Sequence, residues 1–179
     1  MNKHNMILAI DPSGAFSEGK GTTGWCIVEA RKNKVVRSGF LFAKDYDTKE
    51  AFWDAHVNLF VNMVKAYKTS VMVVIEDYIL YASTAEAHIN SRFETSKLIG
   101  ILQYNFFKKH IPYTMQRAVD VKNRWTNEIL IYNKILNQKG NKYYIYGEDK
   151  PINKHIIDSI RHAIHYNTFK NGKEINNGI

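Results

Sequence analysis

Two acidic side chains of this sequence each follow a short apolar run. Asp11 comes directly after residues 6–10, and Glu76 comes directly after residues 71–75. Runs of this length and β-branched content favour buried strands over helices. If the two strands are parallel neighbours, about 4.8 Å apart, their carboxylates meet at one end of a sheet and repel each other. A divalent cation would offset that repulsion, and such oxygen ligands suit Mg²⁺, with Mn²⁺ as a substitute.

A histidine and an aspartate near the end of the sequence could complete such a site. His155 and Asp158 are three residues apart in a segment with helical spacing, so they share one helix face. Four such ligands can hold two ions ~4 Å apart, which together promote displacement at a phosphodiester. His155 could instead act as a general acid or base, because imidazole titrates near neutral pH. His162 and His165 continue the same side and are interpreted as surface residues or phosphate contacts.

Each of these residues also has a simpler interpretation. An acidic residue after a buried strand is typical of a solvated turn, and Asp158 would be favoured by the helix dipole in the first turns of its helix. The hypothesis of a metal site therefore depends on Asp11 and Glu76 lying on adjacent strands.

The apolar pattern predicts the elements that would position these side chains. Strands are predicted at residues 6–10, 23–30, 35–42, 71–75 and 112–116, and helices at residues 49–67, 92–109, 126–138 and 153–169. A helical crossover would make the first and fourth strands parallel. The order of the elements indicates an α/β fold, in which a mixed sheet is covered by helices.

Length and composition fit one compact, soluble domain. With 179 residues and 45% hydrophobic content, the chain is expected to form a single domain over residues 1–170, followed by a polar, flexible tail over 171–179. The formal net charge of +8 suits a polyanionic partner, although many basic proteins bind no nucleic acid. The single cysteine and the lack of an apolar run of about 20 residues favour the cytoplasm and no membrane partner.

Three motifs resemble those of RuvC Holliday junction resolvases, in particular the phage-type members. Ile-Leu-Ala-Ile-Asp-Pro-Ser-Gly at residues 7–14, followed by Thr-Gly-Trp at 23–25, is similar to the opening motif. Val-Val-Ile-Glu-Asp-Tyr at 73–78 looks like the second motif, and His-Ile-Ile-Asp-Ser-Ile at 155–160 looks like the C-terminal one. The resemblance implies a ribonuclease H-like fold with a five-stranded mixed sheet in the order 3-2-1-4-5 and helices on both faces.

The resemblance also implies roles for individual residues. It makes a metal-binding catalytic set of Asp11, Glu76, His155 and Asp158. It matches Lys122 to a lysine near the scissile phosphate. Apart from the resemblance, the basic side chains Arg117 and Arg124 are expected to contact phosphates. The aromatic wedge of the family would fall near residue 79, so Tyr78 or Tyr81 would stack on an unpaired base instead. Residues 126–150 depart from the family pattern.

The implied activity is Mg²⁺-dependent cleavage of four-way and other branched DNA, with up to two ions per site. Such an enzyme would serve recombination or DNA debranching before packaging, in the host cytoplasm if the chain is phage-encoded. Two-fold dimers match the symmetry of a four-way junction, and the helix around Gly100 is the expected dimer face. A close contact of that helix with the sheet would explain Gly100 equally well.

Two alternatives remain open on the sequence alone. The chain could be a noncatalytic module that binds branched DNA, or another ribonuclease H-like nuclease that acts on RNA/DNA hybrids. An actin-like ATPase would need a duplicated fold and a second phosphate loop, and no internal repeat is present.

Overall fold

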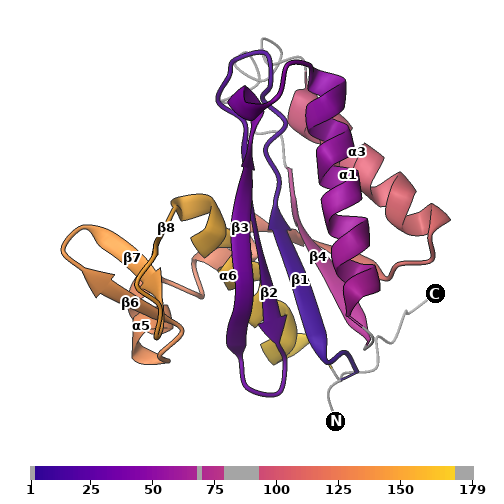
Figure 1. Ribbon diagram of the computed structural model, residues 1–179. Coiled ribbons are helices and arrows are strands. Elements are labelled where there is room, and N and C mark those ends of the chain that lie inside the picture. Colours follow the sequence, from indigo (N-terminus) through magenta and orange to yellow (C-terminus); the bar gives the residue numbers. More distant parts are fainter. Residues whose placement is uncertain (1–2, 68–69, 79–92, 172–179) are drawn as a thin grey trace.

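A five-stranded mixed sheet forms the centre of the molecule, in a computed structural model that describes residues 3–67, 70–78 and 93–171. Its strands are β1 (Met6–Asp11), β2 (Thr22–Glu29), β3 (Lys34–Phe42), β4 (Val71–Asp77) and β5 (Tyr113–Arg117). They are ordered β3-β2-β1-β4-β5 (Figure 1), which confirms the predicted order. The β1–β2 and β2–β3 pairs are antiparallel, whereas β1–β4 and β4–β5 are parallel.

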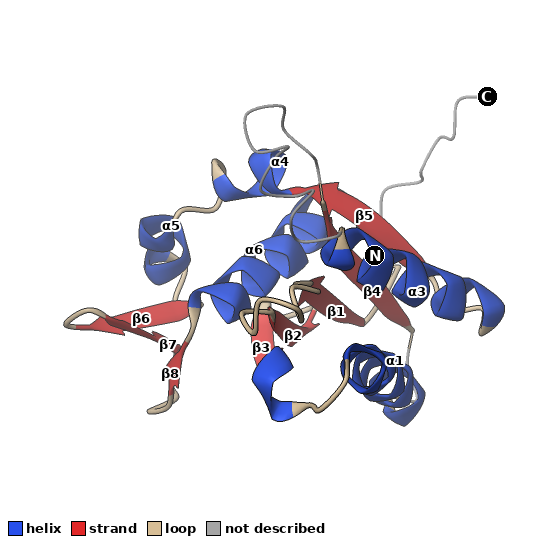
Figure 2. Ribbon diagram, turned by 90° about the horizontal axis from the view of Figure 1, so that it is seen from above, coloured by secondary structure: helices blue, strands red, loops and turns tan. Residues whose placement is uncertain are grey.

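Helices cover both faces of this sheet, as predicted. The longer ones are α1 (Lys49–Ala66), α3 (Glu94–Lys108) and α6 (Lys154–Phe169). Thr48 and Asn153 cap the first turns of α1 and α6, because each side chain accepts a hydrogen bond from a backbone N–H inside its helix. Figure 2 shows α6 on one side of the sheet and α1 on the other.

Side chains of β1 alternate between the two faces of the sheet, and each face has its own hydrophobic core. Ile7 and Ala9 point into a core that includes the apolar side of α6, while Leu8 and Ile10 point into a second core with α1 and α3. A strand that is buried on both faces reads as a continuous apolar run, which is the pattern of residues 6–10.

A second, smaller sheet was not predicted. It consists of β6 (Leu136–Lys139), β7 (Lys142–Ile145) and β8 (Pro151–Ile152), in that order. The prediction of one helix over residues 126–138 is therefore wrong. Short helices α4 (Ala118–Lys122) and α5 (Asn127–Tyr132) precede the small sheet, and a 3-10 turn, η1 (Ala43–Asp45), precedes α1.

Local backbone geometry explains the end of α5 and the turn that follows β6. Lys134 has a φ of 55°, which interrupts the helical path shortly after Tyr132. Gly140, with a φ of 58°, and Asn141 form the two-residue turn between β6 and β7. Leu136 and Ile145 of the small sheet pack into the same core as α6, which anchors the sheet to the main body.

The last described residue joins the two ends of the fold. Asn171 is buried, its side-chain oxygen accepts from the backbone N–H of His4, and its amide donates to the His4 carbonyl. Residues 172–179 fall outside the described part, so the tail remains a prediction. No helix within the described ranges is both long and apolar enough to cross a membrane.

Candidate active site

Three elements bring the predicted catalytic residues to one end of the central sheet. In the parallel β1–β4 pair, Ile10 is level with Ile75, so Asp11 and Glu76 follow at the same height on neighbouring strands. The first turn of α6 lies directly over β2 at Gly24, where an added Cβ would be 2.2 Å from the carbonyl carbon of His155. Only glycine permits that approach, and the approach places α6 beside the end of β1.

Asp11 is held by His155, in the first turn of α6. His155 Nδ1 donates a hydrogen bond of 2.7 Å to Asp11 Oδ2, and Asp11 is buried. Burial raises the pKa of Asp11, and the negative charges of Glu76 and Asp158 add to the rise, while His155 opposes it. These interactions mean that the three carboxylates share one electrostatic environment.

Lys122 links the other two carboxylates. Its Nζ lies 3.1 Å from Glu76 Oε1 and 3.1 Å from Asp158 Oδ2, so the two carboxylate oxygens are separated by at most twice that distance. Burial alone would lower the pKa of Lys122, but Glu76 and Asp158 outweigh it and the pKa is raised. Asp158 is also bound by the guanidinium of Arg161.

A buried histidine fixes the second oxygen of Glu76. His162 is completely buried, and its Nε2 lies 2.9 Å from Glu76 Oε2. Because a carboxylate only accepts hydrogen bonds, this ring nitrogen carries the proton. Nδ1 of the same ring contacts the side chain of Gln116 at 2.9 Å. Burial would raise the pKa of Glu76, but His162 and Lys122 together lower it.

The interpretation of His162 as a surface residue or phosphate contact is therefore wrong. The sequence did contain a signal, since His162 follows Asp158 by four residues and so lies one turn further along the same helix face. Gln116 and Arg161 were missed as well, because neither stands in a recognisable motif. His165, in contrast, is half-buried and packs near Phe169.

The loop after Asp11 is held by a second buried histidine. His56 of α1 donates from Nδ1 to the Phe52 carbonyl at 2.6 Å, and its Nε2 lies 2.8 Å from Thr23 Oγ1. That hydroxyl in turn accepts from the backbone N–H of Ser13 at 3.0 Å. The Thr-Gly-Trp segment thus fixes both the loop beyond Asp11, through Thr23, and the approach of α6, through Gly24.

A divalent cation fits the chemistry of these side chains. Among the described residues, no three His, Cys, Asp or Glu side chains already surround a common point as ligands would. Instead, Lys122 lies between Glu76 and Asp158, and the His155 N–H faces Asp11. Three clustered carboxylates need positive charge, and a hard cation of the Mg²⁺ type suits their oxygens.

The structure describes three of the other four predicted DNA contacts. Tyr78 directly follows β4, is half-buried and packs against the core shared by α1 and α3. Arg117, at the end of β5, forms a two-point ion pair with Asp120, at 2.8 and 2.9 Å. The guanidinium of exposed Arg124 lies 4.6 Å from the centre of the Phe169 ring. Tyr81 lies outside the described residues, and the DNA-binding role of all four stays a prediction.

Solved structures with the same architecture were found by comparison of folds. The chain is similar to RuvC from Thermus thermophilus in complex with a Holliday junction substrate, with a TM-score of 0.65 and 13% identity over 91% of this chain and 92% of that chain. It is also similar to a further structure of Thermus thermophilus RuvC, with a TM-score of 0.63 and 13% identity over 90% and 92% of the two chains. No protein-family model matches the sequence, and no curated protein matches it significantly. The chain therefore has a RuvC-like fold with the ribonuclease H-like architecture that the sequence motifs predicted.

Proposed function

We propose that this chain is a structure-selective endonuclease that hydrolyses phosphodiester bonds in four-way and other branched DNA. The observation that carries the proposal is the convergence of Asp11, Glu76 and Asp158 at one end of a RuvC-like sheet, with Lys122 among them. The structural neighbour bound to a Holliday junction supports the choice of substrate. Such an activity would serve recombination or the debranching of DNA before packaging, in the cytoplasm.

The residues of the site suit a metal-assisted hydrolysis. Asp11, Glu76, Asp158 and His155 would hold up to two Mg²⁺ ions, which when bound lower the pKa of water and neutralise charge on the phosphate. Lys122 can place its ammonium against a phosphate oxygen at these carboxylates. With Nδ1–H donating to Asp11, His155 keeps Nε2 as the ring nitrogen that can accept a proton or bind metal.

The bond changes define the products. Water forms the new bond to phosphorus, the bond from phosphorus to the 3′ oxygen breaks, and that oxygen takes a proton. The products are a 5′-phosphate and a 3′-hydroxyl. Glu76 contacts His162 with one oxygen and Lys122 with the other, and these two contacts fix the orientation of its carboxylate.

A homodimer is part of the proposal, because paired cuts in a four-way junction need two sites. The exposed side of α3 supports it. Tyr104 and Phe107 are 62% and 73% exposed, and an added Cβ at Gly100 would meet no atom of the described residues within 4 Å. The alternative explanation of Gly100, a close contact with the sheet of the same chain, is therefore wrong.

Cleavage assays with an active-site variant test the proposal. Purified protein is expected to cut labelled four-way and three-way DNA with Mg²⁺ but not with EDTA, and to leave linear duplex intact. Asp11→Asn should lose roughly 100-fold or more in cleavage rate while it keeps junction binding, because it removes a carboxylate charge but little volume. Asp54→Asn, at an exposed position of α1, is the matched control and should cut normally.

Two results would contradict the proposal. Wild-type protein that binds junctions but stays inert with both Mg²⁺ and Mn²⁺ would indicate a noncatalytic DNA-binding module. Cleavage of RNA/DNA hybrids in preference to branched DNA would indicate a different nuclease of the same fold.

A further inference from the structure

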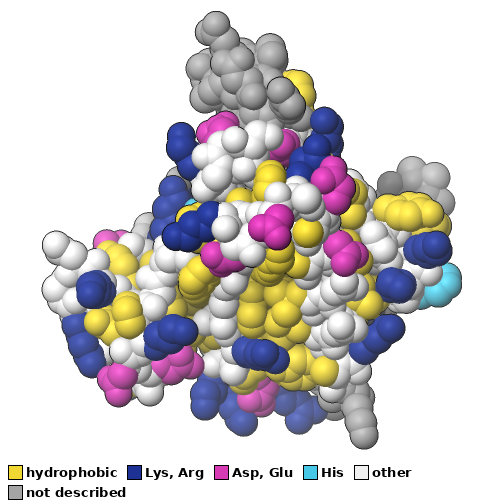
Figure 3. Space-filling model, turned by 45° about the horizontal axis from the view of Figure 1, so that its top comes forward, with side chains coloured by type: hydrophobic (Ala, Val, Ile, Leu, Met, Phe, Trp, Pro, Cys, Tyr) yellow, Lys and Arg dark blue, Asp and Glu magenta, His cyan; other side chains and the backbone are white. Residues whose placement is uncertain are grey.

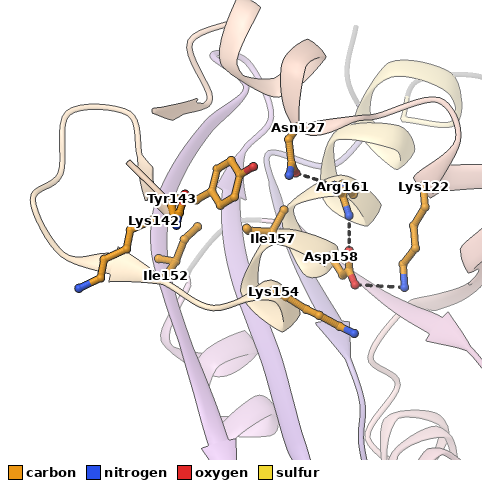
Figure 4. A pocket seen from close by; sticks show the side chains of 10 residues that line it. Lys122, Asn127, Lys142, Tyr143, Ile152, Lys154, Ile157, Asp158 and Arg161 are labelled. Carbon is orange, nitrogen blue, oxygen red and sulfur yellow. Dashed lines mark hydrogen bonds and ion pairs between the residues drawn. The ribbon is translucent and has the colours of Figure 1, made fainter. Parts of the chain in front are cut away.

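A hollow of about 610 Å³ opens beside the candidate active site, between the β6–β8 sheet and the first turns of α6 (Figure 4). Its polar lining includes Lys122, Asn127, Lys142, Lys154, Asp158 and Arg161, and we call it the lateral groove. Because Lys122 and Asp158 belong to both, the groove is continuous with the catalytic cluster.

The lateral groove carries an excess of positive charge. Four of its side chains are cationic, and Asp158 is its one carboxylate. Lys122 pairs with one oxygen of Asp158 and Arg161 with the other, so the remaining lysines of the groove have no carboxylate of their own in its lining. Lys142 and Lys154 are exposed and form no ion pair within the described part of the chain.

Arg161 holds the end of the groove that is nearest to α5. Its guanidinium bridges Asp158 and Asn127, with a distance of 2.6 Å to the Asn127 side-chain oxygen. Its Nε is buried and has no hydrogen-bond partner among the residues that the structure describes. The groove therefore offers donors and positive charge in surplus, which is the requirement for an anionic ligand.

The arrangement of the amino groups favours a polymer over a small anion. Figure 4 shows Lys142 on the small sheet, Lys154 at the start of α6 and Lys122 near Asp158 spread along the groove, and not gathered around one point. Figure 3 shows several Lys and Arg side chains, with some Asp and Glu side chains among them, on the β6–β8 side of the molecule. A row of cations matches the successive phosphates of a nucleic-acid strand.

We propose that the lateral groove binds the sugar–phosphate backbone of the DNA strand next to the phosphate that is cut. The β6–β8 sheet, which lies between α5 and α6 in the chain, then acts as a DNA-positioning element through Lys142, and α6 contributes Lys154. This inference rests on the proposed function, because it takes the clustered carboxylates as the place of cleavage.

The salt dependence of junction binding in EDTA tests the groove separately from catalysis. The double variant Lys142→Ala/Lys154→Ala should bind a four-way junction more weakly. Its slope of log affinity against log salt should be shallower by roughly 1.5 to 2, as expected for two lost phosphate contacts. Lys34→Ala/Lys65→Ala removes the same charge at exposed positions away from the groove and should leave the slope unchanged.

A crosslink tests where the strand lies. Cys26 is buried, so Asn141→Cys at the exposed β6–β7 turn supplies a single accessible thiol. The DNA probes carry a thiol at successive backbone positions. We expect disulfide crosslinks only for positions within a few nucleotides of the cut phosphate, and only on one side of it along the strand. Lys65→Cys is the control and should not share that pattern.

The outcomes separate the two proposals. Wild-type protein that cuts junctions, combined with an unchanged salt slope in the groove variant or crosslinks spread evenly along the arms, overturns the groove and leaves the nuclease intact. Wild-type protein that binds no DNA overturns both. Displacement of the junction by millimolar inorganic phosphate in wild type but not in the groove variant would indicate a small-anion site and overturn the strand assignment.

Discussion

Lys122 stands between Glu76 and Asp158 and is the residue on which the charge balance of the site depends. Both of its contacts are 3.1 Å long, and its own pKa is raised by the two carboxylates despite partial burial. Without Lys122, the carboxylates of Glu76 and Asp158 would face each other, and of the two only Asp158 would keep an ion pair with an arginine, Arg161. Ion pairs of this kind are costly to break because the remaining charges stay poorly solvated.

Lys122→Met is expected to lower the free energy of unfolding by about 1 to 2 kcal/mol at pH 7 in EDTA. Added Mg²⁺ should recover part of that loss, because a cation can then bind the freed carboxylates. Urea unfolding with EDTA and with Mg²⁺ measures both values. Lys139→Met breaks an exposed pair with Asp149 and should cost little in either condition. Equal losses with and without Mg²⁺ for Lys122→Met would contradict a metal site here.

For individual residues, the sequence predicted which side chains of the candidate site would lie close together, but not the contacts that fix their positions. Asp11, Glu76, His155 and Asp158 lie where strand ends and helical spacing predicted, although their roles as metal ligands stay predictions. His162 could not be assigned, because a histidine on a helix face is compatible with both solvent and core. Its burial depends on the carboxylate of Glu76 from a distant strand.

Gly24 illustrates how the elements themselves build the site. It is paired with Asp11 across β1 and β2, and the backbone of α6 passes over it. A side chain there would overlap backbone atoms of His155 and Ile156, at 2.2 to 2.6 Å, which cannot rotate away. The position of α6 over the sheet, and with it the contact between His155 and Asp11, depends on this one missing Cβ.

Gly24→Ala should therefore destabilise the protein by about 1 to 3 kcal/mol or more, as overpacking against backbone does. Chemical denaturation followed by circular dichroism measures the loss. The control, Gly100→Ala, adds a Cβ in open space on a helix of the single chain. At protein concentrations low enough to keep the protein monomeric, it is expected to leave stability unchanged or raise it by up to about 1 kcal/mol. Similar losses in the two variants would show that steric overlap at Gly24 is not the cause.

The helices and strands differ in how well the local pattern of apolar residues predicts them. The strands of the central sheet and the long helices could be predicted because their apolar periodicity is unambiguous. Residues 126–138 could not, because Ile129, Leu130, Ile135 and Leu136 satisfy a helical spacing as well. The break at Lys134 ends the short helix α5, and the Gly140–Asn141 turn makes a hairpin of the residues that follow. Single residues of this kind are weak signals in a sequence.

Across the whole molecule, stability towards acid depends on a histidine buried between α1 and β2. Burial lowers the pKa of His56 from 6.5 to about 4, although its hydrogen bond to the Phe52 carbonyl opposes the shift. Above pH 6.5 the ring is neutral in the folded and the unfolded chain. Between pH 6.5 and about 4 the unfolded chain takes up a proton that the folded chain does not, so unfolding becomes more favourable as the pH falls.

Replacement of His56 should remove that part of the pH dependence. Wild type is expected to lose up to roughly 3 kcal/mol of unfolding free energy through this group between pH 6.5 and 4. His56→Asn should be less stable at pH 7 but show a flatter profile over the same range, measured by urea unfolding at several pH values. His110→Asn, at an exposed site, should keep the wild-type slope. A wild-type slope in His56→Asn would assign the acid sensitivity to other groups.

The clustered carboxylates come from β1, β4 and α6, and Asp158 lies on the last helix of the described chain. A ribosome-bound chain that has not yet been translated as far as α6 can pair its early strands but lacks one of the three carboxylates. Under the proposed function, polypeptides that end before α6 would lack His155 and Asp158, and the capacity to cut DNA would arise only once translation has passed α6.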